Sequence, residues 1–421
     1  MNASRHSAVK DREIPPQLMA QDPDHPAADR GPEPAVNLPP RPVRVCLLIS
    51  SLELGGAERQ VVEMARILDR RKIDPIICSL SEKVPLADGE PEVRKLLHIV
   101  PKRTRFDVGL IPRLAAFLRR ERVDVIHAFL NDSEMAARLS APFAGHPVVI
   151  ASERNADYAR RKRHQWTQVL TRNLFDVMVA NSHAGARFSV RTLGLAEERL
   201  RVVHNGVNAE RFKPDPEAGR RFRESIGLAP DAFVVGMVGN FKRQKDHATF
   251  LRMAARILEQ RPDCRFLVAG GLVEGSPGSA AYAAEIERLA DELGLGDRCR
   301  FLGSQEDMMA FYNACDVTAL LSLHEGTPNV ALESMACGKP VIATDVADNA
   351  IIIEDGTTGF VVPPKDWAAA ADHVSALASD PGRLAMLSSR ARNRVHREFT
   401  PERAACKLAD IYVERFLARS S

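Results

Sequence analysis

The chain has 421 residues, of which 45% are hydrophobic and 27% charged. This composition is typical of a globular protein with two or more domains, and it excludes collagen-like and wholly disordered chains. The sequence contains no run of 18 apolar residues, no apolar core of a signal peptide and no C-x-x-C pair among its seven cysteines. We therefore expect a cytoplasmic protein with reduced thiols.

The net charge of +3 is unevenly distributed along the chain. Residues 1–40 carry a net charge of −2, residues 41–213 carry +10 and residues 214–421 carry −5. A basic half followed by an acidic half indicates two units with different partners. The first 40 residues also hold 8 of the 27 prolines. They are expected to form a disordered tail, because they cannot bury enough apolar surface to fold.

From residue 43 onward, short apolar runs alternate with segments of helical periodicity, which is typical of βαβ units around a buried parallel sheet. The predicted strands of the first array are 43–50, 76–80, 97–100, 123–128, 148–152, 177–181 and 200–204. Its predicted helices are 57–68, 107–122, 134–143, 158–174 and 183–194.

The alternation breaks at Asn205-Gly206 and at Lys213-Pro214-Asp215-Pro216, which we interpret as a turn and a linker. It then resumes with predicted strands over 234–239, 265–270, 317–322, 340–344 and 359–362. Predicted helices follow over 246–260, 281–293, 329–337 and 401–418. We therefore expect an α/β chain with a tail (1–40), a first domain (41–213), a second domain (214–395) and a C-terminal segment (396–421).

One candidate segment follows the first strand of each array. It is rich in glycine in the first array and basic in the second. In Leu54-Gly55-Gly56, paired glycines let backbone N–H groups approach an anion at a helix start, although a plain tight turn explains them equally well. The second segment is Asn240-Phe241-Lys242-Arg243-Gln244-Lys245. Its three cations suit a phosphate at the carboxyl end of a strand, or else form a solvated basic loop.

A third segment places two carboxylates eight residues apart around a helix start. It reads His324-Glu325-Gly326-Thr327-Pro328-Asn329-Val330-Ala331-Leu332-Glu333. Its loop can offer N–H groups to a phosphate or sugar, Glu325 can accept hydrogen bonds from hydroxyls, and Glu333 suits a ribose diol. The alternative is a capped amphipathic helix with surface acids.

This third segment, continued by Met335-Ala336-Cys337-Gly338-Lys339-Pro340-Val341, resembles the signature of glycosyltransferase family 4. The segments 203–214 and 355–364 also resemble that family, and the similarity covers about residues 43–418. The resemblance implies the GT-B fold, with two Rossmann-like doubly wound parallel-sheet domains, a cleft between them and a C-terminal helix that crosses back to the first domain. It also implies a retaining hexosyltransferase that uses a nucleotide-sugar and needs no cofactor and no metal.

The resemblance assigns roles to individual residues. Lys245 matches the lysine that contacts the donor diphosphate, Glu325 the acid that touches the transferred sugar, and Glu333 the ribose-binding glutamate. The family's usual arginine is replaced by Asn240, so Lys242 or Arg243 is the expected second phosphate cation. The other residues expected to bind the donor are Gly55, Gly56, Gly326, Thr327, Asn329 and Val330.

His127 stands where the family often has H-x-H, but here the segment reads His127-Ala128-Phe129. Two interpretations stay open. Either His127 points into the cleft and contacts the donor sugar during catalysis, or it is a hydrogen-bonded histidine at a strand end.

The basic first domain bears on the acceptor. Its cations concentrate at Lys102, Arg103, Arg105, Arg113, Arg119, Arg120, Arg122, Arg154 and 160–163, and residues 110–122 also have an apolar face. We expect either peripheral contact with the anionic inner face of the membrane or a soluble domain with a solvated basic face. Nucleic acid is not expected as a partner, because aromatic residues make up only 5% of the chain and do not interleave with the cations.

The function expected from these observations is transfer of a sugar from a UDP- or GDP-sugar to a lipid-linked or saccharide acceptor, in the synthesis of a cell-surface polysaccharide or glycolipid. The alternatives are a non-catalytic protein that binds a nucleotide-sugar and an epimerase of the same fold.

Overall fold

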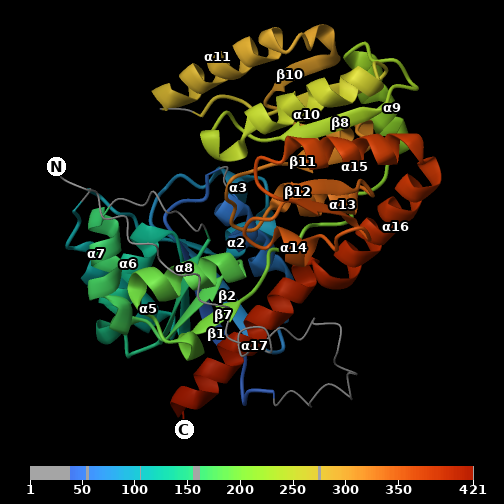
Figure 1. The fold of residues 1–421 in the computed structure, drawn as a ribbon. Helices are drawn as coiled ribbons and strands as arrows, with labels where there is room; N and C mark the ends of the chain where they lie inside the picture. Colours follow the sequence, from blue (N-terminus) through green and yellow to red (C-terminus); the bar gives the residue numbers. More distant parts are fainter. Residues whose placement is uncertain (1–37, 54–55, 105, 155–161, 274–275, 421) are drawn as a thin grey trace, which may run out of the picture. The chain divides into compact units, whose positions relative to one another are not determined.

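The computed structural model describes residues 38–53, 56–104, 106–154, 162–273 and 276–420 (Figure 1). Two parallel β-sheets organise the region from residue 39 onward, and each has helices packed on it. The predicted α/β class with two Rossmann-like domains is therefore confirmed. The predicted tail falls almost entirely outside the described residues.

The first sheet has seven strands in the order β3-β2-β1-β4-β5-β6-β7, and all its neighbouring strands run parallel. The strand order reverses beside β1, which makes this a doubly wound sheet with a switch point at the carboxyl ends of β1 and β4. Its strands are β1 (Val43–Ile49), β2 (Ile73–Ser79), β3 (Leu97–Ile99), β4 (Val125–Phe129), β5 (Val148–Glu153), β6 (Val177–Ala180) and β7 (Leu200–Val202).

The helices that accompany the first sheet connect consecutive strands. They are α2 (Gly56–Ile67), α3 (Pro85–Asp88), α4 (Pro91–Leu96), α5 (Leu110–Arg120), α6 (Asn131–Ser140), α7 (Lys162–Leu170) and α8 (His183–Leu193). Short 3₁₀ turns follow at η1 (Ala141–Phe143), η2 (Arg172–Leu174) and η3 (Glu197–Arg199).

The second sheet has six parallel strands in the order β10-β9-β8-β11-β12-β13. They are β8 (Val234–Val238), β9 (Arg265–Ala269), β10 (Cys299–Gly303), β11 (Val317–Leu320), β12 (Val341–Thr344) and β13 (Gly359–Val362). The accompanying helices are α9 (Pro216–Ser225), α10 (His247–Gln260), α11 (Pro277–Glu292), α12 (Met308–Ala314), α13 (Asn329–Ala336), α14 (Asn349–Ile352), α15 (Trp367–Ser379) and α16 (Pro381–Glu398), with 3₁₀ turns η4 (Arg243–Lys245) and η5 (Gly296–Arg298).

The predicted linker at residues 213–216 is wrong in its second half, because α9 begins there. The Asp215 carboxylate accepts a hydrogen bond from the Ala218 N–H at 2.9 Å, and Pro216 occupies the first helical position. An N-cap aspartate followed by proline favours a helix start as strongly as a turn. Strand β10 was not predicted either, because it is a short, half-buried edge strand.

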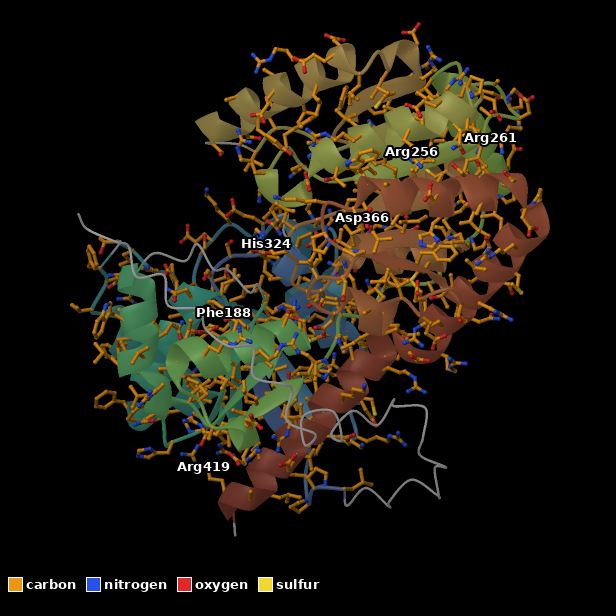
Figure 2. All side chains as sticks on the ribbon, viewed as in Figure 1. Phe188, Arg256, Arg261, His324, Asp366 and Arg419 are labelled. Atoms are coloured by element: carbon orange, nitrogen blue, oxygen red, sulfur yellow. The ribbon has the colours of Figure 1, made fainter. Side chains whose placement is uncertain are left out.

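The last helix, α17 (Pro401–Ser420), leaves the second domain and packs on the first, as expected (Figure 1). Its buried face, which includes Leu408 and Tyr412, joins the core formed by β1 and α2. Arg419 lies near the end of this helix (Figure 2). It donates a hydrogen bond to the Pro147 carbonyl at 2.8 Å. No helix in the described part of the chain combines the length and apolarity needed to cross a bilayer.

Candidate functional site

A cavity of about 600 Å³ is lined by residues of both domains. One wall comes from the start of α2 and from the segment after β7, and the opposite wall comes from the loop after β8 and from α13. Four of the predicted donor-binding residues meet there, namely Gly56, Asn240, Asn329 and Glu333. Gly55 lies outside the described residues. The carboxyl ends of parallel strands thus face one another across a space large enough for a nucleotide-sized ligand.

Lys245, which belongs to the same loop as the cavity-lining Asn240, forms an ion pair with Glu325. The Lys245 ammonium donates to Glu325 Oε1 at 2.6 Å, and the Ser322 hydroxyl donates to the same oxygen at 2.6 Å. Both side chains are largely shielded from solvent, with exposed fractions of 18% and 8%. A Cβ at Gly239 would lie 3.0 Å from Lys245 Cγ, so the glycine gives the lysine stem room. The lysine and the first of the two predicted carboxylates are therefore neighbours.

The loop between Glu325 and α13 touches the first domain. The Thr327 hydroxyl donates a hydrogen bond to the Asn181 carbonyl at the end of β6, and Asn205 Nδ2 donates to Asn329 Oδ1 at 2.9 Å. Gly326 and Val330 are half-buried in the same loop and first turn. The predicted loop residues thus line up along the boundary between the two domains.

Glu333 projects from the second turn of α13 and accepts a hydrogen bond from the Tyr312 hydroxyl at 2.8 Å. Burial raises the pKa of Glu333, while Tyr312, Arg211 and Arg59 act in the opposite direction. Both arginines line the cavity. The sequence offered little sign of these three neighbours, because each comes from a different element. Tyr312 belongs to α12, Arg211 to the segment between β7 and α9, and Arg59 to α2, where it directly follows the Gly-Gly-Ala-Glu segment.

The residues expected to replace the missing arginine behave differently from one another. Asn240 Oδ1 accepts a hydrogen bond from the Gly271 N–H at 3.2 Å, which ties together the turns after β8 and β9. Arg243 turns toward α11, where it pairs with Glu285 at 2.6 Å and lies over the Tyr282 ring at 4.9 Å. Lys242 is exposed. Neither Lys242 nor Arg243 lines the cavity, whereas Arg59 and Arg211 do.

His127 lies in the core of the first domain. It is 1% exposed, and its ring nitrogens are hydrogen-bonded to the Tyr412 hydroxyl at 2.6 Å and to the Ser152 hydroxyl at 2.8 Å. Burial lowers the pKa of His127 to about 3, so the ring is neutral at ordinary pH. This geometry favours the second interpretation of His127, a hydrogen-bonded histidine at a strand end, and does not bring it to the cavity.

A buried carboxylate of the second domain binds two histidines of the first. Asp348 Oδ2 accepts hydrogen bonds from His183 Nδ1 at 3.0 Å and His204 Nε2 at 2.8 Å, and its two oxygens also accept from the backbone N–H groups of His183 and Ala184. Burial opposes ionisation of Asp348, but these hydrogen bonds outweigh it and hold its pKa well below the usual range. Within the described ranges, this trio is the one group whose donor atoms are spaced to hold a metal ion.

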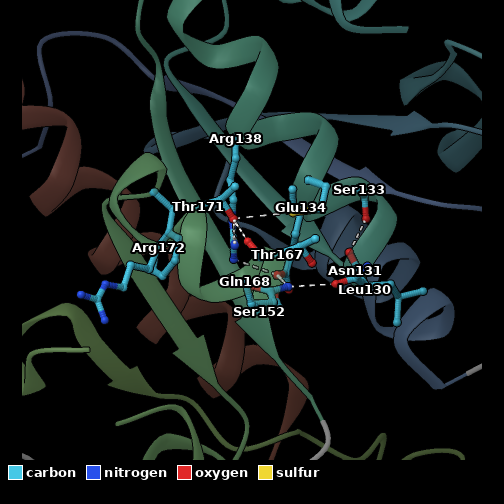
Figure 3. Close-up of polar contacts among 12 residues, drawn as sticks. Leu130, Asn131, Ser133, Glu134, Arg138, Ser152, Thr167, Gln168, Thr171 and Arg172 are labelled. Carbon is cyan, nitrogen blue, oxygen red and sulfur yellow. Dashed lines mark hydrogen bonds and ion pairs between the residues drawn. The ribbon is translucent and has the colours of Figure 1, made fainter. Parts of the chain in front are cut away.

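A second polar cluster lies buried between α6 and α7 (Figure 3). Glu134 Oε2 accepts hydrogen bonds from Arg138 Nη2 and from Gln168 Nε2, each at 3.0 Å. Arg138 is fully buried and lies 4.5 Å from the centroid of the Phe175 ring. These contacts anchor α7 to α6.

The apolar face expected to meet a membrane is already occupied. In α5, the side chains of Leu110, Leu114, Phe117 and Leu118 are buried in the core of the first domain. That part of the membrane expectation is therefore wrong, because the amphipathic helix covers its own sheet. The exposed apolar side chains lie elsewhere, and Phe106 and Val108 in the preceding loop are 83% and 87% exposed.

Comparisons with known proteins agree with this arrangement. Residues 54–211 match the family described as Glycosyltransferase Family 4, and residues 220–394 match Glycosyl transferases group 1. A D-inositol 3-phosphate glycosyltransferase of Thermobispora bispora is 33% identical over 318 residues, which are 72% of this chain and 73% of the relative. The chain spans about half the length of several other curated D-inositol 3-phosphate glycosyltransferases that it matches.

Two further proteins cover nearly the whole region from residue 39 onward. A UDP-Gal:alpha-D-GlcNAc-diphosphoundecaprenol alpha-1,3-galactosyltransferase of Escherichia coli is 25% identical over 378 residues, which are 86% of this chain and 94% of that enzyme. The crystal structure of Anabaena HepE in complex with UDP and glucose has a TM-score of 0.75 at 21% identity, and it covers 88% of this chain and 99% of HepE. The structural likeness shows that the fold is shared.

Proposed function

Because the chain belongs to glycosyltransferase family 4, of the group 1 type, we propose that it transfers a sugar from a nucleotide-sugar to an acceptor hydroxyl with retention of configuration. The observation that carries the proposal is the position of Glu333 in the wall of the cavity between the domains, together with the Lys245–Glu325 ion pair formed by the loops after β8 and β11. An ammonium and two carboxylates suit, in turn, the diphosphate, the sugar hydroxyls and the ribose of one donor molecule.

In the reaction that we propose, the bound donor breaks the ion pair between Lys245 and Glu325 and binds both residues. Sugar hydroxyls replace the Lys245 ammonium on Glu325, and the freed ammonium binds the diphosphate. As the bond between sugar and diphosphate breaks, negative charge grows on the leaving oxygen, where Lys245 stabilises it. The acceptor hydroxyl attacks the same face of an oxocarbenium-like sugar, its oxygen bonds to the sugar carbon, and its proton passes to the departing diphosphate oxygen. The nucleoside diphosphate then leaves, and the configuration is retained.

The second cation for the diphosphate is supplied, in this proposal, by Arg59 and Arg211. Both line the cavity that holds Asn240, whereas Arg243 is held by Glu285. Together with Lys245 and the N–H groups at the start of α13, they provide the positive charge that the leaving group requires. The proposed reaction therefore uses neither a metal nor a cofactor.

We further propose a UDP-sugar as donor and a lipid-linked or saccharide acceptor. The name of the E. coli relative, with its diphosphoundecaprenol acceptor, supports a lipid-linked acceptor, and the HepE complex with UDP supports the uridine nucleotide. Contact with the anionic inner leaflet would use the exposed Phe106 and Val108 beside Lys102 and Arg103, in place of the buried face of α5.

Calorimetric titration with UDP, GDP and ADP, followed by transfer assays with the matching sugars, tests the proposal. We expect one nucleotide to bind the wild type and Lys245→Ala to weaken it at least tenfold, while Glu325→Ala abolishes transfer but still binds the nucleotide. Failure of all three nucleotides to bind would overturn the proposal.

A separate experiment tests the membrane contact. The double variant Phe106→Ser/Val108→Ser should sediment less with phosphatidylglycerol vesicles than the wild type does, and equal sedimentation of the two proteins would contradict the contact.

A further inference from the structure

A second cavity, of about 570 Å³, lies on a different part of the second domain. It is formed by α9, by α16 and by the turn from α13 into β12, and it shares no lining residue with the cavity that holds Glu333. Four cations line it, namely Arg220, Arg223, Lys339 and Arg392, against one carboxylate, Glu224. Nothing in the proposed transfer reaction uses these residues.

Two of the four cations are already neutralised by the protein. Arg220 pairs with both Glu217 and Glu224, and Arg223 binds Asp316 at 2.9 Å and three backbone carbonyls. Their donors are therefore occupied, and neither would gain much from an added anion.

The other two cations have no carboxylate within ion-pair distance in the described part of the chain. Among the described residues, the Lys339 ammonium donates only to the Asn313 carbonyl, at 3.3 Å, and Arg392 Nε donates to His396 at 3.3 Å. The terminal nitrogens of Arg392 make no recorded hydrogen bond in the described structure. Burial lowers the pKa of Lys339, and the charge of Asp316, which Arg223 already binds, offsets this only in part.

Both cations act at the same place in the cavity. Lys339 and Arg392 line this cavity together with Cys337. Burial raises the pKa of the Cys337 thiol to about 12; Lys339 and Arg392 act to lower it, and Glu333 acts to raise it. Three carbonyls near the end of α13 are already hydrogen-bonded within the protein. Those of Glu333, Ser334 and Met335 accept hydrogen bonds from the N–H groups of the turn that follows. Ser388 and Ser389 complete the wall.

From these contacts we propose that this cavity is a binding site for a phosphorylated small molecule, with Lys339 and Arg392 holding the phosphoryl group. An ammonium and a guanidinium with free donors suit a phosphate dianion, and the volume accommodates a molecule of sugar-phosphate size. The ligand supplies the anionic partner that both cations lack.

The site is connected to the donor cavity by a single short helix. Asn329 and Glu333 of α13 line the donor cavity, and Cys337-Gly338-Lys339, directly after the same helix, line the second one. Resting on the proposed function, a ligand that fixes this turn would also fix α13 and change the affinity for the nucleotide. The two ligands would then be coupled reciprocally.

Inorganic phosphate and glycerol 3-phosphate are the probes, titrated calorimetrically into the full chain. Binding should weaken at least tenfold in Lys339→Met and in Arg392→Gln, and should be unchanged in Arg221→Ala, an exposed arginine of α9 that does not line the cavity. It should also persist in Lys245→Ala, which separates this site from the donor cavity. Weaker binding of phosphate alone than of glycerol 3-phosphate would identify a phosphate ester as the ligand class.

Absence of measurable binding of either probe to the wild type at 10 mM would overturn the proposal, and so would equal affinity in the wild type, Lys339→Met and Arg392→Gln. Arg392→Gln keeps the test decisive if Lys339→Met fails to fold, because Arg392 is partly exposed. Phosphate binding needs no nucleotide. Failure of the proposed glycosyl transfer would therefore show in the nucleotide titration and leave this result intact.

Discussion

Asp348 of the second domain and His204 of the first are joined by a hydrogen bond of 2.8 Å between Oδ2 and Nε2. His183 donates to the same carboxylate oxygen, so one buried aspartate binds two histidines and a helix N-terminus across the domain boundary. The carboxylate therefore links the domains through charge as well as through packing.

Asp348→Asn should lower the free energy of unfolding by about 1.5–3 kcal/mol, because the amide cannot replace a charged acceptor of several hydrogen bonds. The pKa of Asp348 is lowered in the folded state, so its contribution is present at neutral pH and is lost as the pH falls below about 3.9, the usual value for an unfolded aspartate. Urea denaturation at pH 7 measures the loss. Asp345→Asn, at an exposed carboxylate of the same loop, should change little.

Arg59→Ala should weaken binding of the nucleotide diphosphate about tenfold, because a charge-assisted hydrogen bond is lost from the cavity. Adding Asn240→Arg should restore much of that affinity by returning a guanidinium to the turn after β8. Calorimetry on the single and double variants checks this. Arg243→Ala is the control, since Glu285 already holds its charge. A loss in the control as large as that in Arg59→Ala would contradict our assignment.

His127→Gln should leave the pH dependence of transfer between pH 6 and 8 unchanged, because His127 is buried and neutral there. Its folded pKa of about 3 lies below the unfolded value of about 6.5. The unfolded state therefore takes up the proton first, and His127 destabilises the fold as the pH falls from about 6.5 toward 3. Thermal unfolding of His127→Gln should accordingly show a weaker acid destabilisation than the wild type. A changed pH–rate profile would instead argue for a catalytic histidine.

Glu134→Ala should destabilise the first domain by about 3–5 kcal/mol, because it removes the carboxylate that faces the fully buried Arg138. Glu92→Ala should cost less than about 1 kcal/mol, since its pair with Lys95 is exposed to solvent. Chemical denaturation of the two variants measures the difference. Similar losses in both would show that the cluster in Figure 3 contributes no more than a surface pair.

The sequence was sufficient for the parts of the fold that depend on local patterning. Lys245, Glu325 and Glu333 lie in contiguous segments next to strand ends, so their positions followed from the order of strands. Tyr312 hydrogen-bonds Glu333, and the charges of Arg59 and Arg211 act on it, from three separate elements that no local pattern connects. The apolar face of α5 was visible in the sequence, but whether it met a sheet or a membrane depended on tertiary packing.

The return of the chain to the first domain has a consequence for biosynthesis. The Val207 N–H donates to the Phe399 carbonyl at 2.9 Å, so the segments entering and leaving the second domain lie side by side. Tyr412, which closes over His127, is translated only after that whole domain. The core of the first domain therefore lacks α17 until the second domain has been translated, and a chain cut within the second domain would leave that core without its last helix.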